Sequence, residues 1–157
     1  MSLQMLGITI APLPLWPRDG FLPSLEECAA LITSRTRGII LVSPNNPTGA
    51  VYPPSLVSSF AALARSRQVA LILDETYRDF IVSTEASPVP HDLFHSPSWR
   101  SNVIHLFSFS KSYAIPGHRL GAIVGAPSFL TQVSTVLDSL QVPSYRSLMS
   151  YFMLLTD

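Results

Sequence analysis

The chain has 157 residues, with ten basic and ten acidic side chains and a formal net charge of zero at pH 7. This length suffices for one domain with a hydrophobic core, and the balanced charge argues against nucleic acid or an anionic membrane surface as a partner. Charged residues make up only 13% of the chain and apolar residues 47%, whereas soluble domains carry about 25% charged residues. We therefore expect exposed apolar patches and poor solubility for the isolated chain.

A single cysteine, Cys28, excludes an internal disulfide and fits a reducing compartment, so we expect a cytoplasmic location. We interpret Cys28 as a small buried hydrophobe in a helix, not as a nucleophile. The apolar stretch 1–15 lacks a basic n-region and contains Pro12 and Pro14, which is not typical of a signal peptide. No uninterrupted apolar run reaches the roughly 18 residues that a membrane span needs.

The first elements are predicted from local pattern. Residues 5–15 are predicted to form a short strand that leads into an extended, proline-containing segment, and residues 16–20 a turn. Ser24 is a predicted N-cap for a helix that runs to about Ser34.

Short apolar runs then alternate with helical patterns. The runs are aliphatic and rich in β-branched residues, as expected for strands buried in a parallel sheet. The predicted strands are 38–43, 69–73, 103–107 and 120–124. Helices are predicted over about 53–65, with Phe60, Leu63 and Ala64 on the buried face, and over about 128–140. This alternation predicts an α/β fold with a mostly parallel sheet and flanking helices.

The segment 81–100 is predicted to be a proline-containing loop. His91 and His95 lie four residues apart in it, but the prolines argue against a regular helix and no further ligands converge there. We therefore expect no metal site.

Unusual polar residues follow two of the predicted strands. Asn46 lies in the loop 44–49, which two prolines make rigid and which would hold an amide over a crevice at the sheet edge. Asp74 ends the next strand, and the phenol of Tyr77 follows three residues later. Each feature also has a simpler interpretation: an ordinary turn for Asn46, an N-cap for Asp74 and a rim aromatic for Tyr77.

The third strand runs into Ser108, Ser110 and Lys111, which is the only lysine of the chain. A desolvated amine can lose its proton and form a Schiff base, and two hydroxyls with Arg119 can bind a phosphate. The simpler interpretation is a solvated turn with one incidental lysine. Because the carboxyl ends of parallel strands share one edge of a sheet, the three groups can converge on one site.

The three motifs together, 44–49, 74–77 and 108–121, resemble the class I/II aminotransferases, which are pyridoxal-phosphate enzymes of fold type I. Their order and spacing match, and the resemblance covers roughly residues 5–140. It implies transfer of an amino group between an amino acid and a 2-oxo acid.

The resemblance also implies a role for each residue. Lys111 resembles the Schiff-base lysine, which also moves the proton at the substrate α-carbon. Asp74 resembles the partner of the pyridinium nitrogen, and Asn46 and Tyr77 resemble the donors to the cofactor's phenolate oxygen. The residues that resemble the phosphate cup are Ser108, Ser110 and Arg119.

Other parts of the family pattern are missing from this sequence. We expect a partial large domain over 1–141 and a divergent tail over 142–157, from a truncated or mis-spliced product, without the N-terminal segment and the small domain of the family. Arg146 is not in a context that assigns it to the substrate carboxylate. Family members are homodimers. The motifs leave two alternatives open, a pyridoxal-phosphate lyase of the same fold and a remnant without catalysis.

Overall fold

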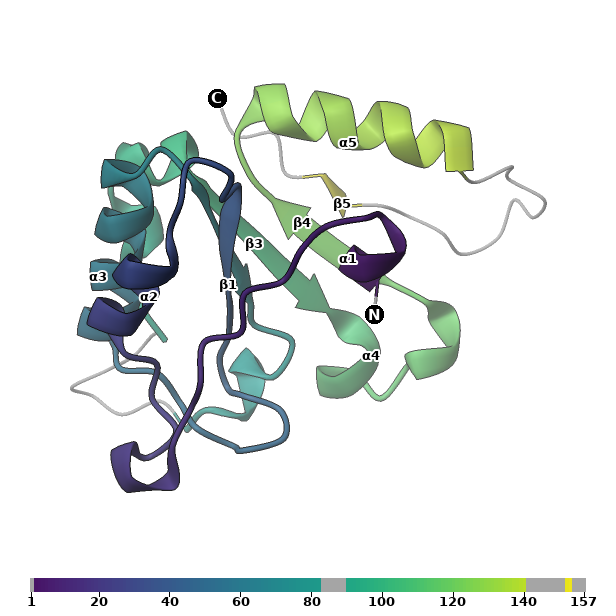
Figure 1. The fold of residues 1–157 in the computed structure, drawn as a ribbon. Helices are drawn as coiled ribbons and strands as arrows, with labels where there is room; N and C mark the ends of the chain where they lie inside the picture. Colours follow the sequence, from purple (N-terminus) through teal and green to yellow (C-terminus); the bar gives the residue numbers. More distant parts are fainter. Residues whose placement is uncertain (1, 83–89, 141–151, 154–157) are drawn as a thin grey trace.

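The computed structural model describes residues 2–82, 90–140 and 152–153 (Figure 1). The described residues form one five-stranded sheet in the order β1-β2-β3-β4-β5. The strands are β1 Gly38–Val42, β2 Ala70–Asp74, β3 Val103–Ser108, β4 Gly121–Val124 and β5 Phe152–Met153. All neighbouring strands run parallel except β3 and β4, which are antiparallel. The predicted α/β fold with a mostly parallel sheet is confirmed.

The helices lie mainly beside the sheet, with α2 and α3 together at the β1 side and α5 at the β4 side (Figure 1). Their bounds are α1 Ser2–Met5, α2 Leu25–Leu31, α3 Pro54–Ser66, α4 Phe109–Ser112 and α5 Pro127–Leu140. Short 3-10 helices occupy Pro17–Asp19, Arg78–Phe80, Leu93–His95, Pro97–Ser101 and Pro116–His118. No helix in the described part of the chain is both long and apolar enough to span a membrane.

One face of the sheet packs against α2 and α3 and forms the core. Alternate residues of β1 and β2 point to this face and pack against α3. Phe60 and Ala64 of α3 are fully buried there, as predicted. Leu63 is partly buried against the same cluster. Cys28 of α2 is also buried there, and burial raises the pKa of its thiol, which agrees with a structural role.

The opposite face of the sheet carries an apolar row with little cover. Ile40 of β1 pairs in register with Ile72 of β2, which pairs with Ile104 of β3. Ile40 is 49% exposed. The structure thus confirms the exposed apolar side chains that the composition predicts. Asp74, two residues after Ile72, and Ser108, four residues after Ile104, share this face with the row, because side chains alternate along a strand.

Two predictions about the first elements are wrong. No strand forms over 5–15: the amides of Leu6, Gly7 and Ile8 bond back to carbonyls of α1, and the following prolines lack the N–H that a strand ladder needs. The helix capped by Ser24 ends at Leu31 instead of Ser34. Past it, the hydroxyls of Thr33 and Thr36 accept nearby backbone N–H groups and so compete with the helix.

The predicted tail, 142–157, lies outside the described residues except for β5. The predicted loop 81–100 contains short 3-10 helices in its described part, from residue 90 onward.

Candidate active site

The polar residues predicted from the three strand ends gather at one edge of the sheet. The strands β1, β2 and β3 are parallel, and Asp74 pairs in register with Val42 of β1 and Leu106 of β3. Asn46 follows β1, Asp74 ends β2, and Ser108 ends β3. The topology therefore brings all three groups to the carboxyl edge of the sheet, where open α/β sheets bind ligands.

The loop after β1 meets the turn after β2. The amide Nδ2 of Asn46 lies 3.5 Å from the hydroxyl oxygen of Tyr77. Asn45 fixes the loop: its side-chain oxygen accepts from the Thr48 hydroxyl at 2.8 Å, and its carbonyl accepts from the Gly49 amide at 2.7 Å. Gly49 has a φ of +76°, which favours glycine. The loop thus holds the exposed Asn46 amide beside the phenol.

Asp74 is partly buried and is bonded locally. Its Oδ1 accepts from the Thr76 amide at 3.0 Å and from the Thr76 hydroxyl at 2.7 Å. Among the described residues nothing donates to its Oδ2. The carboxylate therefore stabilises the local turn to Thr76 and is not a helix N-cap, because Tyr77 takes that place before the next 3-10 helix, and its Oδ2 stays available to a further donor.

The third strand end is built around the short helix α4. The Ser108 hydroxyl caps α4 by accepting from the Ser110 amide at 3.3 Å. Lys111 lies in the last turn of α4 and is exposed, and its ammonium makes no hydrogen bond or ion pair with the described residues. Ser110 and Lys111 therefore lie on one helical turn directly after β3, and Ser108 caps that turn.

Arg119 lies beside this turn through the backbone. The Phe109 amide donates to the Leu120 carbonyl at 3.2 Å, and Gly121 pairs with Ser108. Arg119 itself has a φ of +53° and its guanidinium donates to the Pro116 carbonyl at 3.1 Å. The side chain is exposed, and the described contacts do not join it to the serines.

Behind Asp74 lies a buried ionic cluster that the sequence motifs do not predict. Glu75 is 2% exposed, and its carboxylate lies 2.9 Å from Nε2 of His105, 3.1 Å from Nε2 of His91 and 3.4 Å from Nη1 of Arg78. Burial by itself raises the pKa of Glu75, but its interactions with His105 and His91 outweigh this effect and lower the pKa to about 2. Glu75 is therefore a carboxylate at neutral pH.

The contacts around the two imidazoles indicate where their protons lie. The Leu93 amide donates to Nδ1 of His91, so this nitrogen carries a lone pair and the ring proton lies on Nε2, which is 3.1 Å from Oε1 of Glu75. Nδ1 of His105 is buried and has no partner among the described residues, which disfavours a proton there. Nε2 of His105 therefore donates to Oε2 of Glu75, whereas Nε2 of His91 lies 3.1 Å from Oε1 without hydrogen-bond geometry, and the Arg78 guanidinium adds a positive charge beside the carboxylate.

The histidines of the loop do not act as a pair. His91 is buried against Glu75, whereas His95 is exposed. No group of three or more metal-binding side chains is found among residues 2–82, 90–140 and 152–153.

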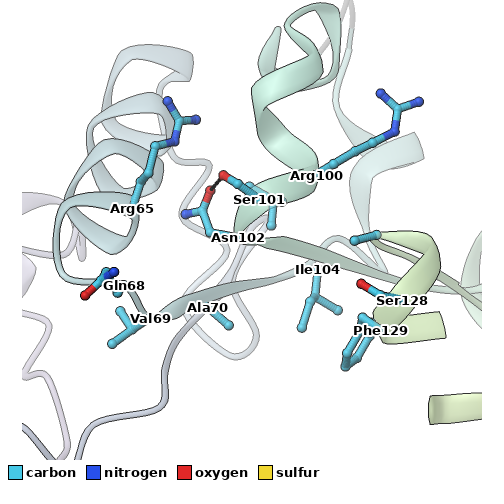
Figure 2. Close-up of a pocket in the computed structure, with 12 residues that line it drawn as sticks. Arg65, Gln68, Val69, Ala70, Arg100, Ser101, Asn102, Ile104, Ser128 and Phe129 are labelled. Atoms are coloured by element: carbon cyan, nitrogen blue, oxygen red, sulfur yellow. Dashed lines mark hydrogen bonds between the residues drawn. The ribbon is translucent and has the colours of Figure 1, made fainter. Parts of the chain in front are cut away.

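A pocket of about 510 Å³ opens at the opposite edge of the sheet (Figure 2). It lies where β2 and β3 begin, and its lining includes Arg65, Gln68, Ala70, Asn102, Ile104 and Phe129. Arg65 bonds to Ser98, and Asn102 donates to the Ala61 carbonyl, so these polar groups serve the fold. None of the predicted site residues lines this pocket.

The comparisons with known proteins agree with the fold and the motifs. The family model for aminotransferase class I and II matches residues 1–154, which extends beyond the range 5–140 of the motif-based resemblance. An aspartate aminotransferase of Thermotoga maritima is 30% identical over 130 residues, covering 83% of this chain and 33% of that protein. An arginine–pyruvate transaminase of Pseudomonas aeruginosa is 37% identical over 120 residues, covering 76% and 29%.

A solved structure of an aspartate aminotransferase variant from Thermus thermophilus superposes with a TM-score of 0.78 at 27% identity, covering 88% of this chain and 36% of that one. The chain thus spans about a third of the length of the relatives that it matches. On the family match over nearly its whole length, the chain belongs to the class I and II aminotransferases.

Proposed function

We propose that this chain carries the pyridoxal-phosphate side of an aminotransferase active site, which moves an amino group between an amino acid and a 2-oxo acid. The family uses pyridoxal 5'-phosphate. The observation that carries the proposal is the meeting of three strand ends at one sheet edge, where the Asn46 amide lies 3.5 Å from the Tyr77 hydroxyl and Asp74 lies between β1 and β3.

The residues present fit this cofactor. Oδ2 of Asp74 accepts no hydrogen bond from the described residues, so it can accept one from a pyridinium N–H on the open face. Asn46 and Tyr77 offer two adjacent donors, which suit a phenolate oxygen. The hydroxyls of Ser108 and Ser110 suit phosphate oxygens, and Arg119 can add guanidinium N–H groups besides the one that it gives to Pro116.

When bound, the cofactor supplies an electron sink for bonds at the substrate α-carbon. The chain's own residues would do the rest. Lys111 would hold the cofactor's aldehyde carbon covalently and, once displaced by the substrate, would move the proton at the α-carbon. Asp74 would keep the ring nitrogen protonated, because its negative charge stabilises the adjacent cation.

The names of the relatives favour transfer over elimination. They include aspartate, arginine–pyruvate, histidinol-phosphate and aromatic amino acid aminotransferases, and thus differ in their amino acid. We therefore propose the reaction class and not a particular amino acid. We further propose a cytoplasmic protein that works as a homodimer, as the family and the single free cysteine suggest.

The test uses the fact that Lys111 is the only lysine. The purified chain is mixed with pyridoxal phosphate, reduced with borohydride and mapped by mass spectrometry. A stoichiometric adduct at Lys111 that is lost in Lys111→Ala and weakened in Asp74→Asn would support the proposal. An adduct found only at the α-amino group of Met1, or an amount of adduct no greater than that of an unfolded peptide, would contradict the proposal. The chain would then be a remnant without catalysis.

A further inference from the structure

Asp74 and Glu75 are neighbours in sequence that serve opposite faces of the sheet. Asp74 shares the open face with Ile72, two residues before it. The next residue, Glu75, is 2% exposed and points into the covered side. Any displacement of Glu75 therefore moves the backbone that carries Asp74.

Three separate segments of the chain hold the Glu75 carboxylate. His105 of β3 contacts Oε2 at 2.9 Å, His91 contacts Oε1 at 3.1 Å, and Arg78 contacts Oε2 at 3.4 Å. The two histidines are buried and Arg78 is 30% exposed. A buried carboxylate with this set of donors is fixed in place, because losing one donor leaves a buried charge less satisfied.

The same contacts close the turn that presents Tyr77. The Arg78 amide donates to the Glu75 carbonyl at 3.0 Å, and the Arg78 guanidinium returns to the Glu75 carboxylate. The Glu75 amide donates to the Leu106 carbonyl at 2.9 Å, two residues before Ser108. Main chain and side chain of Glu75 therefore tie the turn 75–78 to β3.

We propose that Glu75 is a positioning residue, which sets the places of Asp74 and Tyr77 at the sheet edge through its contacts with His105, His91 and Arg78. The proposal rests on the proposed function only for the roles of Asp74 and Tyr77 in cofactor binding. The positions of these two residues do not depend on the proposed function, so a separate experiment without cofactor measures them.

The test compares Glu75→Gln with a second test variant, Arg78→Met, and with one control, Phe60→Leu, in the full chain. Glu75→Gln keeps the shape of the side chain but replaces one acceptor oxygen with a donor NH₂ that faces an imidazole N–H. Phe60→Leu removes core packing in α3, outside the turn, and controls for a general loss of stability. Arg78→Met removes only the outer, partly exposed contact, so it keeps the test valid if Glu75→Gln does not fold.

The first readout is amide hydrogen exchange without cofactor. We expect the amides of Thr76 and Arg78 to exchange about tenfold faster in Glu75→Gln than in Phe60→Leu, and severalfold faster in Arg78→Met than in the parent chain. An even rise over the whole chain, as in Phe60→Leu, would overturn the proposal and leave Glu75 with a role in stability alone.

The second readout is the rate of borohydride-trapped adduct formation at Lys111 with pyridoxal phosphate. A loss in Glu75→Gln that exceeds the loss in Phe60→Leu supports the proposal, and equal losses contradict it. A parent chain without any adduct refutes the proposed function, while the exchange pattern still decides whether Glu75 positions the turn.

Discussion

Oε2 of Glu75, the residue after β2, lies 2.9 Å from Nε2 of His105 within β3, and both side chains are buried. This contact joins the residue after Asp74 to the strand that ends at Ser108. This contact therefore connects β2 and β3 through side chains, in addition to the backbone hydrogen bonds between the two strands. The contacts that hold the Glu75 carboxylate lie on the covered face, so they leave Oδ2 of Asp74 without a donor among the described residues.

The first prediction is acid sensitivity of the fold through Glu75. Its pKa is about 2 in the folded chain and near 4.5 without these contacts. The depressed folded pKa means that the stabilisation is complete above pH 4.5 and is lost as pH falls toward about 2. The shift corresponds to about 3 kcal/mol at neutral pH.

Urea unfolding measured near pH 7 and near pH 3 checks this prediction. The free energy of unfolding of Glu75→Gln should fall less between the two pH values than that of the parent chain, because a carboxamide does not titrate. Equal losses for the two proteins would show that other carboxyl groups set the acid sensitivity.

The second prediction concerns the start of α2. The Ser24 hydroxyl accepts from the Glu27 amide at 3.2 Å, and Ser24→Ala removes this cap. We expect a loss of about 1 kcal/mol in the free energy of unfolding. Ser34→Ala, beyond the end of the helix, is the matched control and should change stability by less than about 0.5 kcal/mol. Equal effects would mean that the cap does not stabilise the fold.

The sequence predicts the strands well because each is a short apolar run between helical patterns. The covered face of β1 and β2 needs apolar residues at alternate positions, and the open face of this chain is apolar too, so the runs are unbroken. The stretch 5–15 has the same apolar character, but its first amides bond back to α1, and Pro12 and Pro14 lack the N–H that a strand ladder needs. Apolar character by itself therefore does not predict a strand.

The site residues are predicted from their positions at strand ends, whereas the cluster behind them is not. Glu75 stands next to Asp74 in the motif, and His105 is a polar residue within the apolar strand 103–107. A polar residue at a buried strand position needs a hydrogen-bond partner, so His105 within an apolar strand was the one sequence feature that could have indicated the cluster. His91 lies in a loop far along the sequence, and only the folded structure brings it to Glu75.

The third prediction uses two adjacent residues of β1 that point to opposite faces. Ile40 is 49% exposed on the open face, and Ile39 is 8% exposed in the core. Ile40→Lys should raise the solubility of the chain with little loss of stability, since a lysine there reaches water. Ile39→Lys should prevent folding, because it buries a charge without a partner.

Static light scattering and circular dichroism separate the two outcomes. A more soluble, folded Ile40→Lys chain beside an unfolded Ile39→Lys chain would show that the open face drives association. If Ile40→Lys unfolds like its neighbour, this face is packed in solution and the exposed apolar row does not explain poor solubility.

The last prediction addresses the phenol at the proposed cofactor site. Tyr77→Phe removes the hydroxyl 3.5 Å from the Asn46 amide, a long contact at a partly exposed position, so stability should change by less than about 0.5 kcal/mol. In the proposed role the hydroxyl donates to a phenolate, and a hydrogen bond to a charged group contributes about 1.5–3 kcal/mol. Affinity for pyridoxal phosphate should therefore fall by roughly tenfold or more. Tyr113→Phe, with its ring exposed, is the matched control.

Absorbance titration with pyridoxal phosphate measures this affinity, and thermal unfolding measures stability in the same samples. A tenfold loss confined to Tyr77→Phe would assign the hydroxyl to the cofactor, because the same atom was removed from both tyrosines. Equal affinities for the two variants would instead make Tyr77 a rim aromatic, and the donor to the phenolate would then be Asn46 alone.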